Sequence, residues 1–249
     1  MKKNTPLILA FLAAVLTESC RKENEASPAE EVYTVFQTPV TGLSGLCFAA
    51  DKSGFYAVSD KTGIYELNTD GTLRRKLNYG GSNDFEAISL HPVSRSLYLA
   101  DESQMNVIKL SPDETGFIPV VQISIPGGIA NKGLEGLSCG TDTLYITNQE
   151  SPALLIKYVL STGNEASRTR LDFASYLSDI FFDSSDQTIW ICDSQEQALY
   201  HCTLSGALIA SQDIPFIQKA EALVIDRAAG FAWIGCDASG KLYKIKLSI

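Results

Sequence analysis

Carboxylate side chains recur at one repeated position of this sequence, and their chemistry suits a hard cation. Three glutamates occupy the position: Glu86, Glu135 and Glu221. If they converge to about 5 Å, each pair repels by roughly 3 kcal/mol at an effective dielectric of 20. Calcium bound by their oxygens would offset this repulsion, and it tolerates irregular geometry better than magnesium does. The alternative is that the glutamates accept hydrogen bonds, or are partly protonated, without a metal.

Other polar residues lie close to this position in the sequence. Two of the five repeats carry serine there, and an aspartate directly follows the second serine. Polar groups also gather where the second strand of each repeat is expected to end. We expect a ligand to meet the following residues: Ser44, Asp101, Glu102, Asn148, Glu150, Ser178 and Asp179.

An acidic series lies at the expected end of the second strand of each repeat. Its members are Asp60, Asp101, Asn148, Asp193 and Asp237. Asp and Asn side chains bond to nearby backbone amides in tight turns, so most of the series is interpreted as structural. The extra polar groups beside Asp101 and Asn148 make these two the members expected nearest a ligand.

Five repeats are the elements that would position these residues. Each contains a polar residue, a small residue and an aliphatic run: LSGLCF (43–48), FEAISL (85–90), LEGLSC (134–139), LSDIFF (177–182) and AEALVI (220–225). We name the second residue of each run the axial position: Ser44, Glu86, Glu135, Ser178 and Glu221. Successive axial positions are 42 to 49 residues apart, the length of a four-stranded propeller blade.

The strand pattern predicts an all-β fold, a five-bladed β-propeller of four-stranded antiparallel blades over residues 32–249. Four repeats contain a fourth strand, whereas the fifth repeat reaches Ile249 without one. VYTVFQ (32–37) would supply the missing strand from the N-terminal side and leave no open sheet edge. A β-sandwich is the rival fold, but it does not predict five copies of one pattern in register.

The first residues of the chain have the features of a targeting segment. Lys2 and Lys3 precede an apolar run at 6–16, which is too short to span a bilayer. This order of charge and apolar residues is typical of a signal peptide. We therefore expect a lipoprotein signal peptide over residues 1–19.

The end of that segment indicates a lipid anchor. LTESC resembles the lipobox of bacterial lipoproteins, which makes Cys20 the expected lipidation site; cleavage near Ser19 without modification is the alternative. Residues 20–31 form the expected polar tether. The protein is then expected in the cell envelope, at the outer membrane or facing the periplasm, or exposed at the cell surface. Its membrane attachment would be through this N-terminal lipid only.

Net charge and cysteine content limit the partners and the cysteine chemistry that we expect. The net charge is −9 and no basic stripe is present, so a nucleic acid partner is not expected. Five cysteines follow Cys20, an odd number without C-x-x-C spacing, and we expect them to be small buried core residues. They are Cys47, Cys139, Cys192, Cys202 and Cys236. We expect the propeller to be a monomer.

Nucleophilic catalysis finds little support in the residues. The chain has two histidines, His91 before Pro92 and His201 in an expected third strand, and neither holds an axial position. A G-x-S-x-G elbow and the usual zinc spacings of histidine are absent from the sequence.

The repeat motifs resemble a known family. GLSGL (42–46), NKGLEGL (131–137) and AEALVI (220–225) are similar to motifs of the SdiA-regulated domain family, and the likeness covers essentially all of residues 32–249. The resemblance implies a five-bladed propeller, distantly similar to NHL-repeat proteins, with bound calcium. It places Glu135 in the family motif and makes Glu86 and Glu221 its repeat equivalents.

Two classes of function follow from these features. The first is a binding module of the envelope that presents a calcium-braced face to a small molecule, a glycan or an envelope protein. The alternative is a calcium-dependent hydrolase of lactones or esters, in which the metal polarises a carbonyl group or activates water. We favour binding, because the sequence lacks an evident general base.

Overall fold

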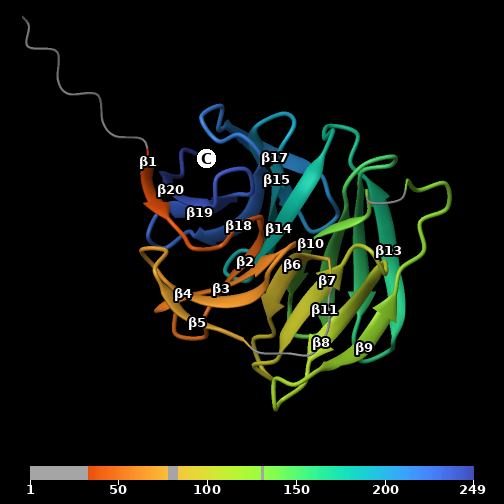
Figure 1. The fold of residues 1–249 in the computed structure, drawn as a ribbon. Helices are drawn as coiled ribbons and strands as arrows, with labels where there is room; N and C mark the ends of the chain where they lie inside the picture. The colour runs from red at the N-terminus through yellow and green to blue at the C-terminus, as the bar shows by residue number, and fades with distance from the viewer. Residues whose placement is uncertain (1–32, 78–83, 130–131) are drawn as a thin grey trace, which may run out of the picture. The chain divides into compact units, whose positions relative to one another are not determined.

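The structure is a computed structural model that describes residues 33–77, 84–129 and 132–249 (Figure 1). Contacts divide the chain into two units, Met1–Glu31 and Val32–Ile249. The predicted signal peptide (1–19), Cys20 and the tether (20–31) lie outside the described residues. The fold below is that of the second unit alone.

Apolar runs bounded by turn residues form the strands of five antiparallel sheets, which we number as blades 1 to 5. Blade 1 contains β2 (Leu43–Phe48), β3 (Gly54–Ser59), β4 (Gly63–Asn68) and β5 (Leu73–Lys76). Blade 2 contains β6 (Phe85–Leu90), β7 (Leu97–Asp101), β8 (Asn106–Leu110) and β9 (Phe117–Gln122). Blade 3 contains β10 (Leu134–Cys139), β11 (Thr143–Asn148), β12 (Leu154–Val159) and β13 (Asn164–Arg170).

The last two blades complete the ring. Blade 4 contains β14 (Leu177–Asp183), β15 (Thr188–Asp193), β16 (Ala198–Thr203) and β17 (Leu208–Asp213). Blade 5 contains β18 (Ala220–Asp226), β19 (Phe231–Cys236), β20 (Lys241–Lys246) and β1 (Tyr33–Gln37). The antiparallel pairing of β1 with β20 joins the two ends of the domain, and Figure 1 shows the red β1 beside the blue β20. The predicted closure of the last blade by an N-terminal strand is confirmed.

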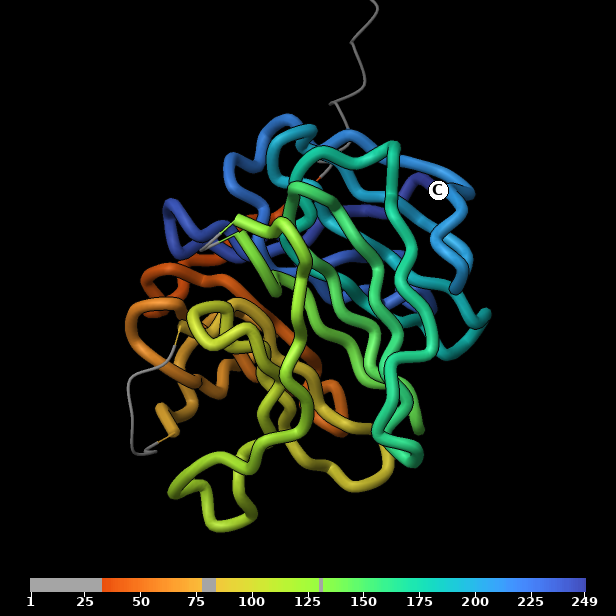
Figure 2. Tube along the Cα trace, turned by 90° about the vertical axis from the view of Figure 1, so that its right-hand side faces the viewer, coloured from red at the N-terminus to blue at the C-terminus, as the bar shows by residue number. Residues whose placement is uncertain are grey.

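The first strand of each repeat is the innermost strand of its blade. β2 packs against β6, β6 against β10, β10 against β14, β14 against β18, and β18 against β2. These contacts form a closed circle of five, and the chain trace follows it from red to blue (Figure 2). The all-β five-bladed β-propeller predicted from the repeats is therefore confirmed.

Burial follows the same geometry. The outermost strands are largely exposed, as in β5, whereas β10 is buried along its whole length. Among the described residues the apolar core consists of five clusters, and each cluster lies between two neighbouring blades. One of them packs Phe55 of blade 1 against Trp233 of blade 5. Interlocked layers of this kind hold the axial positions in a fixed circle.

The five cysteines within the propeller are buried and unpaired, as predicted. Burial raises the pKa of the Cys139 thiol to about 12, so this thiol is protonated at neutral pH. In the part of the chain that the structure describes, no helix could span a bilayer.

Candidate functional site

Each axial residue lies at a β-bulge. The pairing between the first and second strands shifts register at this position in all five blades: at Ser44, Glu86, Glu135, Ser178 and Glu221. A bulged residue is left without a partner in the ladder, and bulges commonly aim a side chain toward a site. The innermost strands encircle the axis, so the five bulges place their residues around one mouth of it.

A second circle of residues surrounds the same mouth. We name it the flanking position, the residue directly after each second strand: Asp60, Glu102, Gln149, Ser194 and Asp237. In four blades its backbone amide donates to the carbonyl two residues before the axial residue, as from Glu102 to Asp84 at 2.9 Å and from Gln149 to Gly133 at 2.8 Å. These shared hydrogen bonds hold the two circles side by side.

The prediction that all five residues of the acidic series end their second strands is wrong for two of them. Asp101, Asn148 and Asp193 end their strands, but Asp60 and Asp237 lie one residue further along, at the flanking position. Ser59 and Cys236 occupy the strand-ending position in blades 1 and 5. Ser59 Oγ accepts hydrogen bonds from the backbone amides of the following turn, as the aspartate side chain does in blades 2 and 4. Blade 1 therefore needs no aspartate at the strand-ending position, and Asp60 was aligned with the wrong residues.

The turn interpretation holds for the strand-ending aspartates. Asp101 Oδ1 accepts hydrogen bonds from Ser103 Oγ at 2.7 Å and from the Gln104 amide at 3.2 Å. Asp193 Oδ1 accepts the amides of Gln195 and Glu196 in the same way. These carboxylates order their own turns.

Blades 2 and 3 carry a cluster of carboxylates at the mouth. One oxygen each from Asp84, Glu86 and Glu102 lies within 4.8 Å of the others. Glu135 of blade 3 adjoins this group, because the charges of Glu86 and Glu102 both act on its carboxyl group. We name these four residues the acidic cluster. The structure thus joins Glu86 and Glu135 to Glu102, and adds Asp84.

Burial and mutual repulsion both disfavour the ionised forms in the acidic cluster. Burial first, and then the charges of Glu102 and Asp84, raise the pKa of Glu86 to about 8, although a hydrogen bond from Ser44 opposes the shift. Burial and the charges of Glu86 and Glu102 raise the pKa of Glu135 well above its usual value. The pKa of Asp84 is raised by burial and by Glu102. At neutral pH the cluster therefore holds protons that a bound cation would replace.

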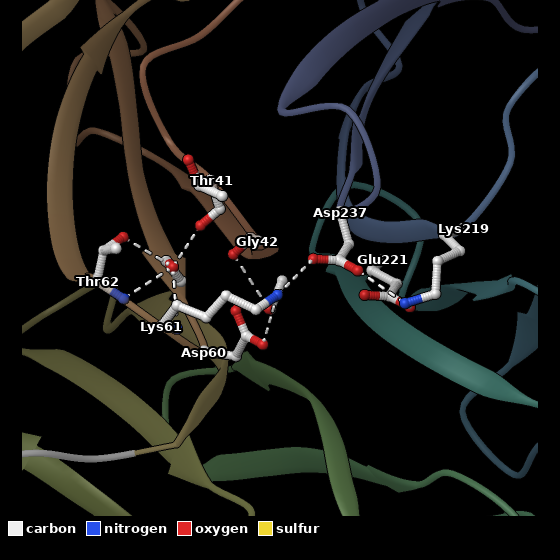
Figure 3. A network of polar contacts seen from close by, with 10 residues as sticks. Thr41, Gly42, Asp60, Lys61, Thr62, Lys219, Glu221 and Asp237 are labelled. Atoms are coloured by element: carbon white, nitrogen blue, oxygen red, sulfur yellow. Dashed lines mark hydrogen bonds and ion pairs between the residues drawn. The ribbon is translucent and has the colours of Figure 1, made fainter.

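The third axial glutamate lies in a different environment. Lys219 Nζ contacts Asp237 Oδ2 at 2.7 Å and Glu221 Oε1 at 3.5 Å (Figure 3). Lys61 Nζ contacts Asp60 Oδ2 at 3.1 Å and Asp237 Oδ1 at 3.7 Å. Two lysines thus compensate part of the negative charge of the three carboxylates of blades 1 and 5.

Lys219 opposes the effect of burial on the pKa of Glu221. Burial and Asp237 raise the pKa of Glu221 to about 7, and Lys219 opposes the rise. The mouth is therefore asymmetric, with a compensated half on blades 1 and 5 and the acidic cluster on blades 2 and 3. The three axial glutamates, which the sequence treats as equivalent, fall into two groups.

The axial serines bridge strands. Ser178 Oγ donates to Ala220 O of blade 5 at 2.6 Å and lies 3.1 Å from Cys192 O. Ser44 Oγ lies 3.3 Å from Gly42 O and also bonds to Glu86 of blade 2. Both serines are buried, and both join neighbouring blades or their own turn.

Asp179 lies inside the ring of innermost strands. Its Oδ1 accepts the Ile180 amide at 2.8 Å, its Oδ2 accepts the Leu223 amide of blade 5 at 2.7 Å, and the Leu137 amide of blade 3 bonds to it as well. It is 2% exposed, and burial raises its pKa well above the usual value. The equivalent residues in the other repeats are small, namely Gly45, Ala87, Gly136 and Ala222. One carboxylate among four small residues is the sequence signal for this internal bridge.

A cavity of about 540 Å³ adjoins the acidic cluster, and the predicted ligand-facing residues Glu102 and Asn148 both line it. Glu150 forms an ion pair with Lys132, whose ammonium group also lies 4.8 Å from the centre of the Tyr176 ring. At the other end of the axis a second cavity of about 210 Å³ is lined by one aliphatic residue from each innermost strand: Leu46, Ile88, Leu137, Ile180 and Leu223. The two ends of the axis therefore differ in chemistry.

Comparison with known proteins identifies the family. A model of the SdiA-regulated family matches residues 33–243. The chain belongs to the SdiA-regulated family. The match includes every axial and flanking residue described above. The five-bladed propeller and both circles of residues at its mouth therefore lie within the matched region of this SdiA-regulated protein. No curated protein sequence matches the chain significantly.

Solved structures share the fold of this SdiA-regulated protein. An auxiliary nutrient binding protein from Bacteroides thetaiotaomicron is 12% identical with a TM-score of 0.56, covering 82% of this chain and 58% of that chain. A glutaminyl cyclase from Myxococcus xanthus is 10% identical with a TM-score of 0.66, covering 86% of this chain and 94% of that one. A gluconolactonase from Xanthomonas campestris is 14% identical with a TM-score of 0.57, covering 82% and 71%. The chain spans about three fifths of the nutrient-binding protein, and at these identities the likeness concerns the fold.

Proposed function

We propose that this protein is a lipid-anchored binding module of the cell envelope that holds calcium at the acidic cluster and binds a small ligand beside it. The observation that carries the proposal is the asymmetry of the mouth. Lysines form ion pairs with the carboxylates of blades 1 and 5, whereas Asp84, Glu86 and Glu102 crowd together without such a lysine contact among the described residues. A cation is the missing counter-charge of that half.

The donor set fits calcium. Calcium takes oxygen ligands at about 2.3–2.6 Å, so two oxygens on opposite sides of one ion lie about 4.8 Å apart. The three carboxylate oxygens of Asp84, Glu86 and Glu102 lie within that distance of one another. Gln149, at the flanking position of blade 3, has a buried Oε1 without a hydrogen-bond partner in the described part of the chain, and calcium accepts such amide oxygens.

Other metals fit this set less well. Zinc prefers imidazole and thiolate ligands. His91 lies beyond β6, and His201 bonds to Thr188 within blade 4. The acidic cluster presents carboxylates instead. Asp84, Glu86 and Glu102 would bind the ion, and the Glu135 carboxyl group would lose a proton and join them as a ligand. When bound, the ion would supply positive charge that holds the mouth together.

Binding is favoured over hydrolysis by what surrounds the cluster. The adjoining cavity is lined by both apolar and polar side chains, and Glu102 and Asn148 are its deeply buried polar members. Each has a structural hydrogen bond of its own: Glu102 with the Gly133 amide, and Asn148 with the carbonyl groups of Glu150 and Pro152. Anchored polar groups on an apolar wall suit recognition of a ligand. The nutrient-binding proteins of the same fold provide a precedent for such a role.

Thermal unfolding of the purified protein tests the calcium site. A ligand at a hundred times its dissociation constant stabilises by about 2.7 kcal/mol, so calcium is expected to raise the midpoint by several degrees relative to a chelator. Glu135→Gln is expected to reduce this rise. Identical curves with calcium and with chelator would contradict the proposed site.

Two further experiments test the remaining parts of the proposal. Labelled palmitate is expected to be incorporated into the wild-type protein in its own cells and not into Cys20→Ala. Lactone, ester and phosphoester substrates are expected to remain intact with calcium present. Turnover of any of them, lost in Glu86→Gln, would replace the binding role by the hydrolase alternative.

A further inference from the structure

The cavity beside the acidic cluster is built for one small molecule. Its volume of about 540 Å³ lies within the range of roughly 300–1,000 Å³ that is typical of small-molecule sites. The β7–β8 turn, the end of β9, the β9–β10 connection and the end of β11 provide its lining. Four aliphatic or thioether side chains form the apolar wall: Met105, Ile123, Ile125 and Ile129. Ile123 is buried and Met105 and Ile125 are half-buried, so a hydrocarbon group would pack against these three side chains.

Charge restricts what else the ligand can carry. Among the described residues that line the cavity, Glu102 is the only charged one. Its carboxylate is 7% exposed and lies within the acidic cluster beside Asp84 and Glu86. Lys132, the nearest described lysine along the chain, is engaged by Glu150. The negative potential of these carboxylates repels anions and attracts cations.

Asn148 adds an unsatisfied acceptor to the same wall. Its Nδ2 donates to the carbonyl of Glu150 at 3.1 Å and to that of Pro152 at 2.7 Å, which fixes the orientation of the amide group. Its Oδ1 is buried and has no hydrogen-bond partner in the part of the chain that the structure describes. Buried acceptors are almost always satisfied in folded proteins, so a ligand that donates a hydrogen bond would complete this one.

We propose that the cavity binds a small primary or secondary alkylammonium ion. Its N–H groups would meet the carboxylate of Glu102 and Oδ1 of Asn148, and its hydrocarbon part would pack against Ile123 and Ile125. An ammonium group combines a positive charge with two or three donors and offers no acceptor, which matches the acceptors of Glu102 and Asn148. A glycan fits less well, because no aromatic side chain of the described residues lines the cavity.

This inference rests on the binding role proposed above and not on the calcium ion. Glu102 belongs to both sites, but Glu86 belongs only to the acidic cluster and Ile129 only to the cavity. Changes at the latter two residues therefore separate the failure of one site from the failure of the other.

Calorimetric titration of the full chain in chelator, with three pentyl probes, tests the proposal. Pentylammonium is expected to bind with a stoichiometry of one, whereas pentan-1-ol and pentanoate, of equal chain length, are expected to bind about tenfold more weakly or worse. Equal binding of the alcohol and the ammonium ion would show an apolar cavity without charge selection and would overturn the proposal. Absence of binding by pentylammonium would overturn it as well.

Two matched lysine substitutions locate the site. Ile129 is 50% exposed on the cavity wall and Val93 is 68% exposed outside it, so neither change threatens the core. Ile129→Lys is expected to weaken pentylammonium binding about tenfold or more, because a second cation then occupies the cavity. Val93→Lys is expected to bind as the wild type does. Wild-type affinity for pentylammonium in Ile129→Lys would overturn the assignment. Glu86→Gln is expected to retain pentylammonium binding whatever its calcium affinity, and this result would show that the two sites are distinct.

Discussion

Oε1 of Glu102 accepts a hydrogen bond from the backbone amide of Gly133 at 2.9 Å. The bond fastens a carboxylate that follows the second strand of blade 2 to the residue that precedes the innermost strand of blade 3. A Cβ atom at Gly133 would collide with Met105 Sδ, so a larger residue here would require the Met105 side chain to move. The acidic cluster is therefore held in part by a backbone contact between two blades.

The pH dependence of stability follows from the raised pKa values. Glu86 titrates at about pH 8 and Glu221 at about pH 7 in the folded protein, whereas both titrate near 4.5 when unfolded. The folded state thus holds more protons between pH 4.5 and 8, so its stability without calcium is expected to fall as pH rises through this window. Each additional proton that the folded state binds relative to the unfolded state lowers the free energy of unfolding by about 1.4 kcal/mol per pH unit.

Urea unfolding in chelator at pH 5, 6.5 and 8 measures this trend. Glu86→Gln is expected to flatten it, since glutamine holds no titrating proton. A stability that rises steadily from pH 5 to 8 in chelator would contradict the raised pKa of Glu86.

Asp179→Asn is expected to destabilise the propeller by about 2–3 kcal/mol. The Asp179 carboxylate accepts amides from Ile180, Leu223 and Leu137, and an asparagine amide group would set an N–H against one of these donors. The exposed Asp213→Asn is the matched control and is expected to change stability by less than about 0.5 kcal/mol. Equal midpoints for the two variants in urea would show that Asp179 is protonated and already donates a hydrogen bond.

Lys219→Gln is expected to raise the pKa of Glu221 above its value of about 7, because Lys219 is the group that lowers it. The shift is measurable by following the side-chain carboxyl carbon of Glu221 by NMR as a function of pH. Lys52→Gln, which breaks an ion pair with Asp226 elsewhere, serves as the control. An unchanged titration of Glu221 in Lys219→Gln would mean that water already screens the contact.

The repeats were enough to predict the fold, because each blade has the same strand order and the number of repeats gives the number of blades. Closure by β1 was also predictable, since the fifth repeat lacks a strand that residues 32–37 could supply. These features depend on local patterns and on a rule that sheets avoid open edges. Three-dimensional contacts between blades were not needed.

The asymmetry of the mouth was harder to foresee. Alignment of aspartates placed Asp60 and Asp237 one residue away from their true equivalent, Glu102, because Ser59 and Cys236 end their strands without a carboxylate. A signal for Lys219 was nevertheless present. It lies two residues before Glu221, where blade 2 has Asp84, so the charge at this position reverses between the two blades.

Calcium titration of Glu86→Gln and Glu221→Gln tests the central claim most directly. The two substitutions remove the same group from the same repeat position, in the acidic cluster and in the lysine-compensated half respectively. Calorimetry is expected to show that Glu86→Gln weakens calcium binding at least about tenfold, whereas Glu221→Gln changes it little, because Glu221 lies outside the acidic cluster and already contacts Lys219. Equal losses in the two variants would place the ion on the axis among all three glutamates, and no calcium binding by the wild type would contradict the metal site itself.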